Sequence, residues 1–273
     1  MYHREILIDG KKIHYRDEGA GRTLVLLHGF MNSLEVWNTY LLLYMREMRV
    51  ILIDLPGHGK SDVFDEKHTM EFMASTVKAV LDHLEIRECV MVGHSMGGYV
   101  TLAFAEQYPH VLRGFGLVHS HALPDSEEGR ANRERACKLI KESRAKYIVG
   151  FIPELFAKNQ RIHLQQEIKE LQELSLETSD EGIIAAQKGM ASRPGRTEVL
   201  SNATVPVLFI LGGEDYRIPV ELGASQAMLA KHAEITILSD VGHMSLIETP
   251  KMIKERIRGF VNQCFLNYYS GKE

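Results

Sequence analysis

Gly93-His94-Ser95-Met96-Gly97 is the stretch of this chain that decides the fold we predict for it. A short apolar run at residues 88–92 precedes it and is typical of a buried strand, whereas residues 98–105 have the composition of a buried helix. A serine between two glycines at such a junction predicts a sharp strand–turn–helix that exposes the hydroxyl as a nucleophile. We expect a positive φ at Ser95, which costs about 1–3 kcal/mol. Glycines flank the serine because a Cβ there would collide with the neighbouring chain.

Apolar runs and helical stretches alternate along most of the sequence. Such βα alternation predicts a doubly wound, mostly parallel eight-stranded sheet of the α/β class. The first two strands are expected to form a hairpin through Asp9-Gly10. The expected strands are residues 5–8, 12–15, 23–27, 50–53, 90–92, 115–118, 207–211 and 235–238. The expected helices between and after them are residues 34–48, 70–84, 96–107, 220–231 and 250–264.

The alternation breaks in the middle of the chain. Residues 121–200 contain no good strand pattern, and the apolar positions within residues 161–176 recur at helical spacing. A second amphipathic helix is expected around residues 136–148. We therefore predict a core formed by residues 1–120 and 201–273, with residues 121–200 forming a helical cap over the sheet.

Composition restricts the classes of partner. The chain has 273 residues, 45% of them hydrophobic, and a formal net charge of −4, so neither nucleic acid nor an anionic membrane is an expected partner. Its start does not resemble a signal peptide, and no apolar run is long enough to cross a bilayer, so a cytoplasmic location is expected. Three scattered cysteines fit neither a disulfide framework nor a zinc site. The sequence does not indicate an oligomeric state.

A serine hydroxyl needs a base within hydrogen-bonding reach, and that base needs an acid to orient it. Asp215 directly follows the expected strand at residues 207–211, and His243 lies on what we expect to be an exposed loop after the last strand. The carboxyl ends of parallel strands meet at one edge of a sheet, so these groups are expected to converge. The order Ser95, Asp215, His243 is the order that accompanies this type of elbow. Asp240 and Asp125 stay open as alternative acids.

With these motifs the chain resembles the α/β-hydrolases over nearly its whole length, apart from residues 121–200. The likeness includes His28-Gly29-Phe30 after the third strand and the segment at residues 55–62. It implies that the backbone N–H groups of Phe30 and Met96 form an oxyanion hole, and that neither a metal nor an organic cofactor is required. It also places the acid of some relatives after the sixth strand, where Asp125 stands.

Several other side chains have two interpretations. Phe30, Met31, Trp37 and Met244 flank the reactive segments and are candidates for an apolar substrate pocket, although core packing is as good an account of Met31 and Trp37.

His119 and His121 are not expected to bind a metal, because alternate residues of a strand point to opposite faces. We expect structural roles for His28 and His94, as hydrogen-bonding partners of the loops that shape the site.

The resemblance implies a serine hydrolase that cleaves small carboxylic esters through an acyl-enzyme. Ser95 at the elbow argues against the related dehalogenases and epoxide hydrolases, which use aspartate there. The segments at residues 189–194 and 205–208 resemble those of enol-lactonase-like and pimeloyl-ester-hydrolase-like members. The same triad also serves cofactor-free perhydrolases, C–C bond hydrolases and some lyases. A non-catalytic small-molecule receptor with this fold is the alternative from a different class.

Overall fold

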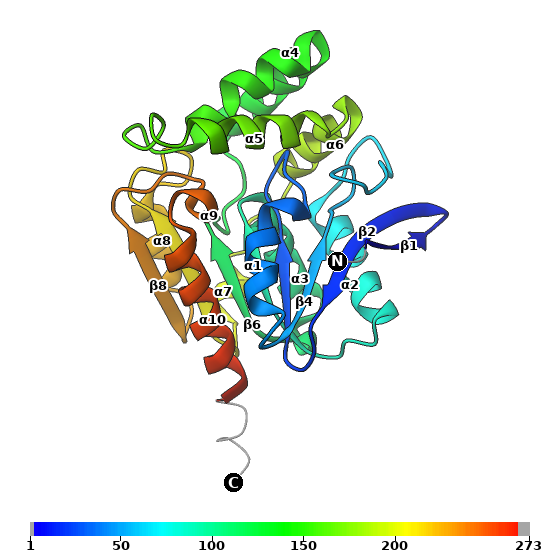
Figure 1. The fold of residues 1–273 in the computed structure, drawn as a ribbon, viewed down its shortest axis with the longest axis vertical. Coiled ribbons are helices and arrows are strands. Elements are labelled where there is room, and N and C mark those ends of the chain that lie inside the picture. Colours follow the sequence, from blue (N-terminus) through cyan, green and yellow to red (C-terminus); the bar gives the residue numbers. More distant parts are fainter. Residues whose placement is uncertain (1–2, 267–273) are drawn as a thin grey trace.

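One eight-stranded sheet organises the protein in a computed structural model, which describes residues 3–266 (Figure 1). The strand order is β1-β2-β4-β3-β5-β6-β7-β8, which confirms the predicted doubly wound sheet. The strands are β1 (Arg4–Ile8), β2 (Lys11–Glu18), β3 (Thr23–Leu27), β4 (Arg49–Ile53), β5 (Cys89–His94), β6 (Leu112–Val118), β7 (Val207–Gly212) and β8 (Ala233–Leu238).

Helices connect the strands. They are η1 (Leu34–Trp37), α1 (Asn38–Tyr44), α2 (Met70–His83), α3 (Met96–Gln107), η2 (Pro109–Val111), α4 (Glu127–Phe151), η3 (Pro153–Leu155), α5 (Gln165–Leu176), α6 (Asp180–Ala191), α7 (Thr197–Ser201), α8 (Val220–Ala227), α9 (Ser245–Glu248) and α10 (Pro250–Leu266). No helix within residues 3–266 combines the length and the apolar character that crossing a bilayer requires.

The sheet is antiparallel only at its first edge. β1 pairs with β2 through a hairpin whose turn residues, Asp9 and Gly10, have φ values of 51° and 78°. β2 then pairs antiparallel with β4, and the remaining neighbours from β4 to β8 are parallel. The carboxyl ends of six parallel strands therefore lie along one edge, where the loops after β3, β5, β6, β7 and β8 meet.

Both faces of the sheet are buried, because successive side chains of each strand point to opposite sides. Along β3, Leu24 and Leu26 pack in one cluster with residues of α1 and α10. Val25 and Leu27 pack in the other cluster, with residues of α2 and α3. This alternation explains why the strand is an unbroken apolar run in the sequence.

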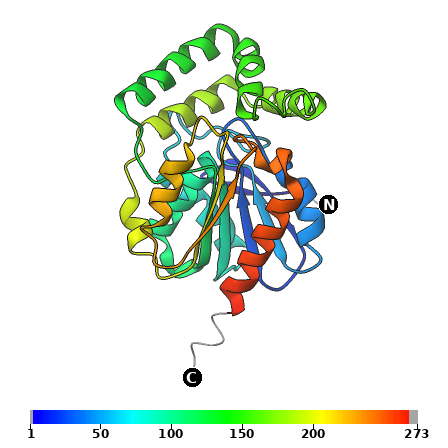
Figure 2. The same cartoon turned by 90° about the vertical axis from the view of Figure 1, so that its left-hand side faces the viewer.

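Helices α4, α5 and α6 lie beyond the end of the sheet and cover that edge (Figures 1 and 2). Helix α4 begins after Ser126, whose hydroxyl accepts a hydrogen bond from the Gly129 N–H at 3.0 Å. It is interrupted at Ser143, which has a non-helical conformation, and it packs against α5 and α6. No strand occurs between β6 and β7, all of which lies in the described part of the chain. The division into a core and a cap at residues 121–200 stays a prediction.

Candidate active site

Ser95 occupies the turn between β5 and α3, with φ 52° and ψ −114°. Its N–H donates to the Val118 carbonyl of the neighbouring strand at 2.9 Å. A Cβ on Gly93 would lie 2.1 Å from the Gly97 oxygen, and a Cβ on Gly97 would lie 2.5 Å from the Leu27 oxygen. Only glycine fits at these two positions, so the spacing of the motif follows from the close approach of strand, turn and helix.

Asp215 and His243 form a buried pair on the loops after β7 and β8. Nδ1 of His243 donates to Oδ2 of Asp215 at 2.7 Å, and both residues are only 4% exposed. The other carboxylate oxygen, Oδ1, accepts the N–H groups of Arg217 and Ile218 at 2.9 and 3.1 Å. Burial alone would raise the pKa of Asp215, but the proximity of His243 and hydrogen bonds from His119 and His243 hold that pKa well below its usual range.

His119 is a second imidazole on the same carboxylate, and no sequence pattern pointed to this role. It follows β6, is fully buried, and donates from Nδ1 to Oδ2 of Asp215 at 2.9 Å. Burial lowers the pKa of His119 despite the neighbouring carboxylate, which favours the neutral ring. His121, two residues on, instead lines the cavity described below and lies 3.2 Å from the Tyr99 hydroxyl.

The loop that carries His243 is held from three sides. The His94 ring donates from Nε2 to the His243 carbonyl at 2.9 Å, and the His243 N–H donates to the Leu155 carbonyl of η3 at 2.7 Å. The Glu248 carboxylate accepts the N–H groups of Gly242 and Met244. The expectation that His243 lies on an exposed loop is therefore wrong, because η3 packs over the loop.

Ser95 and His243 line one cavity of about 620 Å³ beneath the helices at the sheet edge. Because Nδ1 of His243 is bonded to Asp215, Nε2 is the nitrogen left to accept a proton. Within residues 3–266, no hydrogen bond joins the Ser95 hydroxyl to this nitrogen. Such bonds are often long or poorly aligned without substrate and tighten in the reacting complex.

The two expected oxyanion donors belong to segments that pack tightly together. A Cβ on Gly29 would lie 2.7 Å from Nδ1 of His94, so the loop after β3 touches the elbow. Within the described chain, neither the Phe30 nor the Met96 N–H donates a hydrogen bond. Met96 is the first residue of α3, whose N-terminal N–H groups have no partner inside the helix. Two free donors are thus available for a negative oxygen.

Of the four residues expected to line a substrate pocket, the structure places two at the cavity and two in the core. Phe30 and Met244 line the cavity. Met31 and Trp37 do not: both are fully buried, and Trp37, the last residue of η1, packs edge-to-face on Tyr40 of α1. These two predictions are corrected, because the apolar side chains after β3 fill the core on either side of the sheet.

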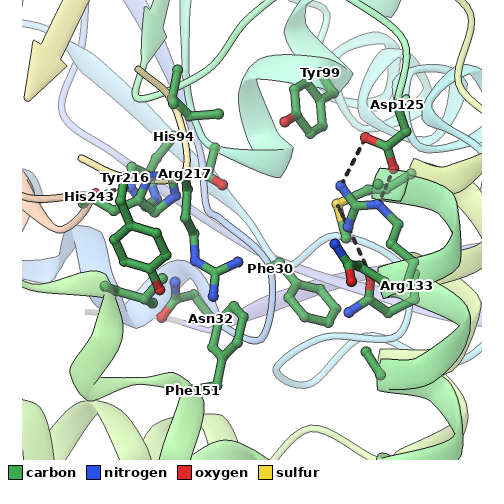
Figure 3. Close-up of a pocket in the computed structure, with 18 of the residues that line it drawn as sticks. Phe30, Asn32, His94, Tyr99, Asp125, Arg133, Phe151, Tyr216, Arg217 and His243 are labelled. Carbon is green, nitrogen blue, oxygen red and sulfur yellow. Dashed lines mark hydrogen bonds and ion pairs between the residues drawn. The ribbon is translucent and has the colours of Figure 1, made fainter. Parts of the chain in front are cut away.

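The opposite wall of the cavity is polar. The Asp125 carboxylate accepts hydrogen bonds from the guanidinium of Arg133 on the cavity wall (Figure 3). It also accepts one from Arg193, which lies outside the cavity lining, at 2.5 Å. Burial would raise the pKa of Asp125, but the hydrogen bond and charge of Arg133, with those of Arg193, lower it. The carboxylate of Asp125 therefore pairs with arginines and does not contact His243. Asp240 is exposed and accepts a hydrogen bond from the Ser239 hydroxyl. Of the three candidate acids, Asp215 is the one that contacts His243.

One group of described residues brings potential metal ligands close together. The ligand atoms of His119, Asp215 and His243 lie within 4.8 Å of one another. Their hydrogen bonds already account for this spacing, because both imidazoles donate from Nδ1 to the same carboxylate oxygen. A metal would have to displace these bonds.

Comparison with known proteins identifies the class. A family profile described as the alpha/beta hydrolase fold matches residues 22–139. A thermophilic esterase from Thermogutta terrifontis, solved with malate bound, superimposes with a TM-score of 0.91. It is 30% identical, over 97% of this chain and 99% of its own. The chain therefore belongs to the α/β-hydrolase family.

Two further relatives are hydrolases by name. The uncharacterized hydrolase YugF of Bacillus subtilis is 28% identical, over 94% of this chain and 97% of its own length. A 2-hydroxy-6-oxononadienedioate/2-hydroxy-6-oxononatrienedioate hydrolase of Paraburkholderia phymatum is 28% identical, over 92% of this chain and 91% of its own. The family includes several hydrolytic reactions, so the site has to decide among them.

Proposed function

We propose that this protein is a serine esterase that cleaves small carboxylic esters without a metal or an organic cofactor. Ser95 is the nucleophile, His243 the base and Asp215 the acid that orients the base. The likeness to an esterase at 30% identity across both chains supports the ester substrate.

The reaction follows from the positions of these groups. The Ser95 hydroxyl attacks the ester carbonyl while Nε2 of His243 takes its proton, and Asp215 stabilises the imidazolium that forms. The Phe30 and Met96 N–H groups bind the oxygen that becomes negative in the tetrahedral intermediate. His243 then protonates the departing alcohol. In the second half, His243 takes a proton from a water molecule that attacks the acyl carbonyl, and returns it to the Ser95 oxygen as the carboxylic acid leaves.

A single observation carries the proposal: the buried Asp215–His243 pair adjoins the cavity that also receives the elbow serine. The 620 Å³ volume is in the range of small-molecule sites, which agrees with an ester of modest size.

Labelling with a fluorophosphonate probe and turnover of p-nitrophenyl esters test the proposal together. The wild type is expected to label and to turn over many times, whereas Ser95→Ala does neither. Ser120→Ala is a matched control, because Ser120 also lies near the elbow but donates its hydroxyl to the Ser95 carbonyl. An inert wild type that still binds a small molecule would establish the receptor alternative instead.

Carbon–carbon bond hydrolysis is the second candidate, since a relative with that type of named substrate matches almost the whole chain. The same Ser95-dependent assay distinguishes the two. Faster cleavage of a vinylogous diketone acid than of any ester in a graded panel would favour the second reaction over the first.

A further inference from the structure

Arg217 is a guanidinium on the cavity wall with no acid beside it. It lines the same cavity as Ser95 and His243, and its side chain points into the space between His243 and Phe151 (Figure 3). Within residues 3–266 the guanidinium makes neither an ion pair nor a hydrogen bond. An arginine with five N–H donors and no partner, facing a substrate cavity, is available to bind an anion.

Two aromatic rings lie beside the guanidinium of Arg217, which is an exposed residue at the cavity mouth. It lies 4.1 Å from the ring centre of Phe151 in α4 and 5.2 Å from that of Tyr216. Its backbone N–H donates to Oδ1 of Asp215 at 2.9 Å, which ties it to the loop of the triad acid. Stacking uses the flat face of a guanidinium and leaves the donors at its edge free for a ligand.

The other charges of the cavity do not neutralise Arg217. Asp125 is the one carboxylate among the lining residues, and it accepts hydrogen bonds from Arg133 on the opposite wall and from Arg193 behind that wall. Asp215 lies behind His243, where donors occupy both of its oxygens. Arg135, the remaining lining arginine, is exposed and donates to Asn132. The lining therefore carries an excess of positive charge.

We propose that the substrate is an acidic ester whose free carboxylate binds Arg217. A half-ester of a dicarboxylic acid, or an ester of a hydroxy acid, has this chemistry. One guanidinium fork matches the geometry and the single charge of one carboxylate. This inference rests on the proposed esterase activity, because it assigns the substrate of the same site.

Matched pairs of esters test it. The acyl pair is mono-p-nitrophenyl adipate and p-nitrophenyl 6-methylheptanoate, in which an isopropyl group replaces the carboxylate. The alcohol pair is 4-acetoxybenzoate and 4-acetoxyacetophenone. In each pair, the ratio of kcat/KM for the anionic ester to that for the neutral ester measures recognition of the carboxylate.

Wild-type enzyme is expected to prefer the anionic ester in at least one pair. Arg217→Met keeps the apolar stem but removes the charge, and should lower that ratio about 10- to 100-fold, as expected for a hydrogen-bonded charge pair. Arg217→Lys should restore part of the ratio, since it keeps the charge without the fork. Arg135→Met, the control for the general positive field of the cavity, should change the ratio by less than about twofold.

The outcomes separate this inference from the proposed function. Efficient, Ser95-dependent cleavage of the neutral esters with no anionic preference, or a preference that survives Arg217→Met, would overturn the assignment of Arg217 and leave the esterase intact. If inorganic phosphate inhibits the enzyme, adipate does not, and Arg217→Met abolishes the inhibition, then the anion that Arg217 binds is not a carboxylate. A wild type that cleaves no ester of either pair would overturn both.

Discussion

Nδ1 of His119 lies 2.9 Å from Oδ2 of Asp215, the same oxygen that accepts the hydrogen bond of His243. The residues come from three different loops, which follow β6, β7 and β8. Together with two backbone N–H groups on Oδ1, this arrangement gives the carboxylate four donors and no freedom to rotate. We therefore propose that His119 positions Asp215, the acid of the proposed triad.

His119→Leu is expected to lower kcat about 10- to 100-fold, because it removes a hydrogen bond to a charged group behind the base. His119→Asn should recover most of the loss, since its amide nitrogen reaches about as far as Nδ1. The pH dependence of kcat provides the readout. Loss of the donor should shift the acidic limb of the pH profile of kcat in His119→Leu but not in His119→Asn. If both variants lose kcat equally and neither shifts the pH profile, His119 has a packing role only.

Asp215→Asn should reduce kcat by about 10⁴, because an amide cannot hold the required tautomer of His243 or stabilise the imidazolium. Steady-state hydrolysis of a p-nitrophenyl ester measures the effect. Asp125→Asn is the matched substitution on the opposite wall, and its kcat should fall far less. The reverse ranking would show that Asp125 is the acid.

Glu248→Gln should weaken the link between the His243 loop and the segment after η3. The Glu248 carboxylate accepts the N–H groups of Gly242, Met244 and Ala157 at 3.0–3.1 Å, and an amide nitrogen would face at least one of these donors. Urea titration is expected to show a free energy of unfolding lower by about 1–3 kcal/mol. Exposed Glu255→Gln on α10 is the control, and an equal loss there would contradict the argument.

Much of the core was predictable because it leaves local marks in the sequence. A strand buried on both faces, such as β3, must be apolar throughout, and the elbow needs glycine wherever backbones touch. Helix α3 was predicted with its observed bounds for the same reason. The stretch at residues 34–48 was less regular than predicted: it contains η1 and a short α1, which ends at Tyr44.

The walls of the site were not predictable in this way. Which residues face the cavity depends on how α4 and η3 dock over the sheet, and helical periodicity contains no information on docking. Phe151 stacks on Arg217 and Leu155 accepts the His243 N–H only because of that docking. Sequence reasoning placed His119 and His121 on opposite sides of a strand, but it had no means of pairing His119 with Asp215.

Chelation should leave the activity unchanged, because the proposed reaction uses no metal. His119, Asp215 and His243 bring three potential ligand atoms within 4.8 Å, so the test is needed here. The kcat of p-nitrophenyl ester hydrolysis is measured before and after dialysis against EDTA and then with added Zn²⁺. A loss on dialysis that Zn²⁺ reverses would contradict the metal-free triad.

Acid should destabilise the protein well above the pH at which carboxylates titrate. Burial, with a smaller contribution from His28, lowers the pKa of His58 to about 3, and burial lowers the pKa of His68 to about 4. Both pKa values start from 6.5 in the unfolded chain, so below pH 6.5 the unfolded state binds protons that the folded state excludes. The stability provided by the neutral rings is present above pH 6.5 and is lost as the pH falls towards 4.

Urea unfolding between pH 7 and pH 4.5 measures this effect. Each such histidine adds at most about 1.4 kcal/mol of lost stability per pH unit. His58→Phe should flatten the curve by up to that amount, because the His58 ring is 1% exposed and packs against Phe30 and His28. His110→Phe, on an exposed residue of η2, is the control and should keep the wild-type slope. A free energy of unfolding that stays constant from pH 7 to pH 4.5 would show that these rings do not exclude protons in the folded protein.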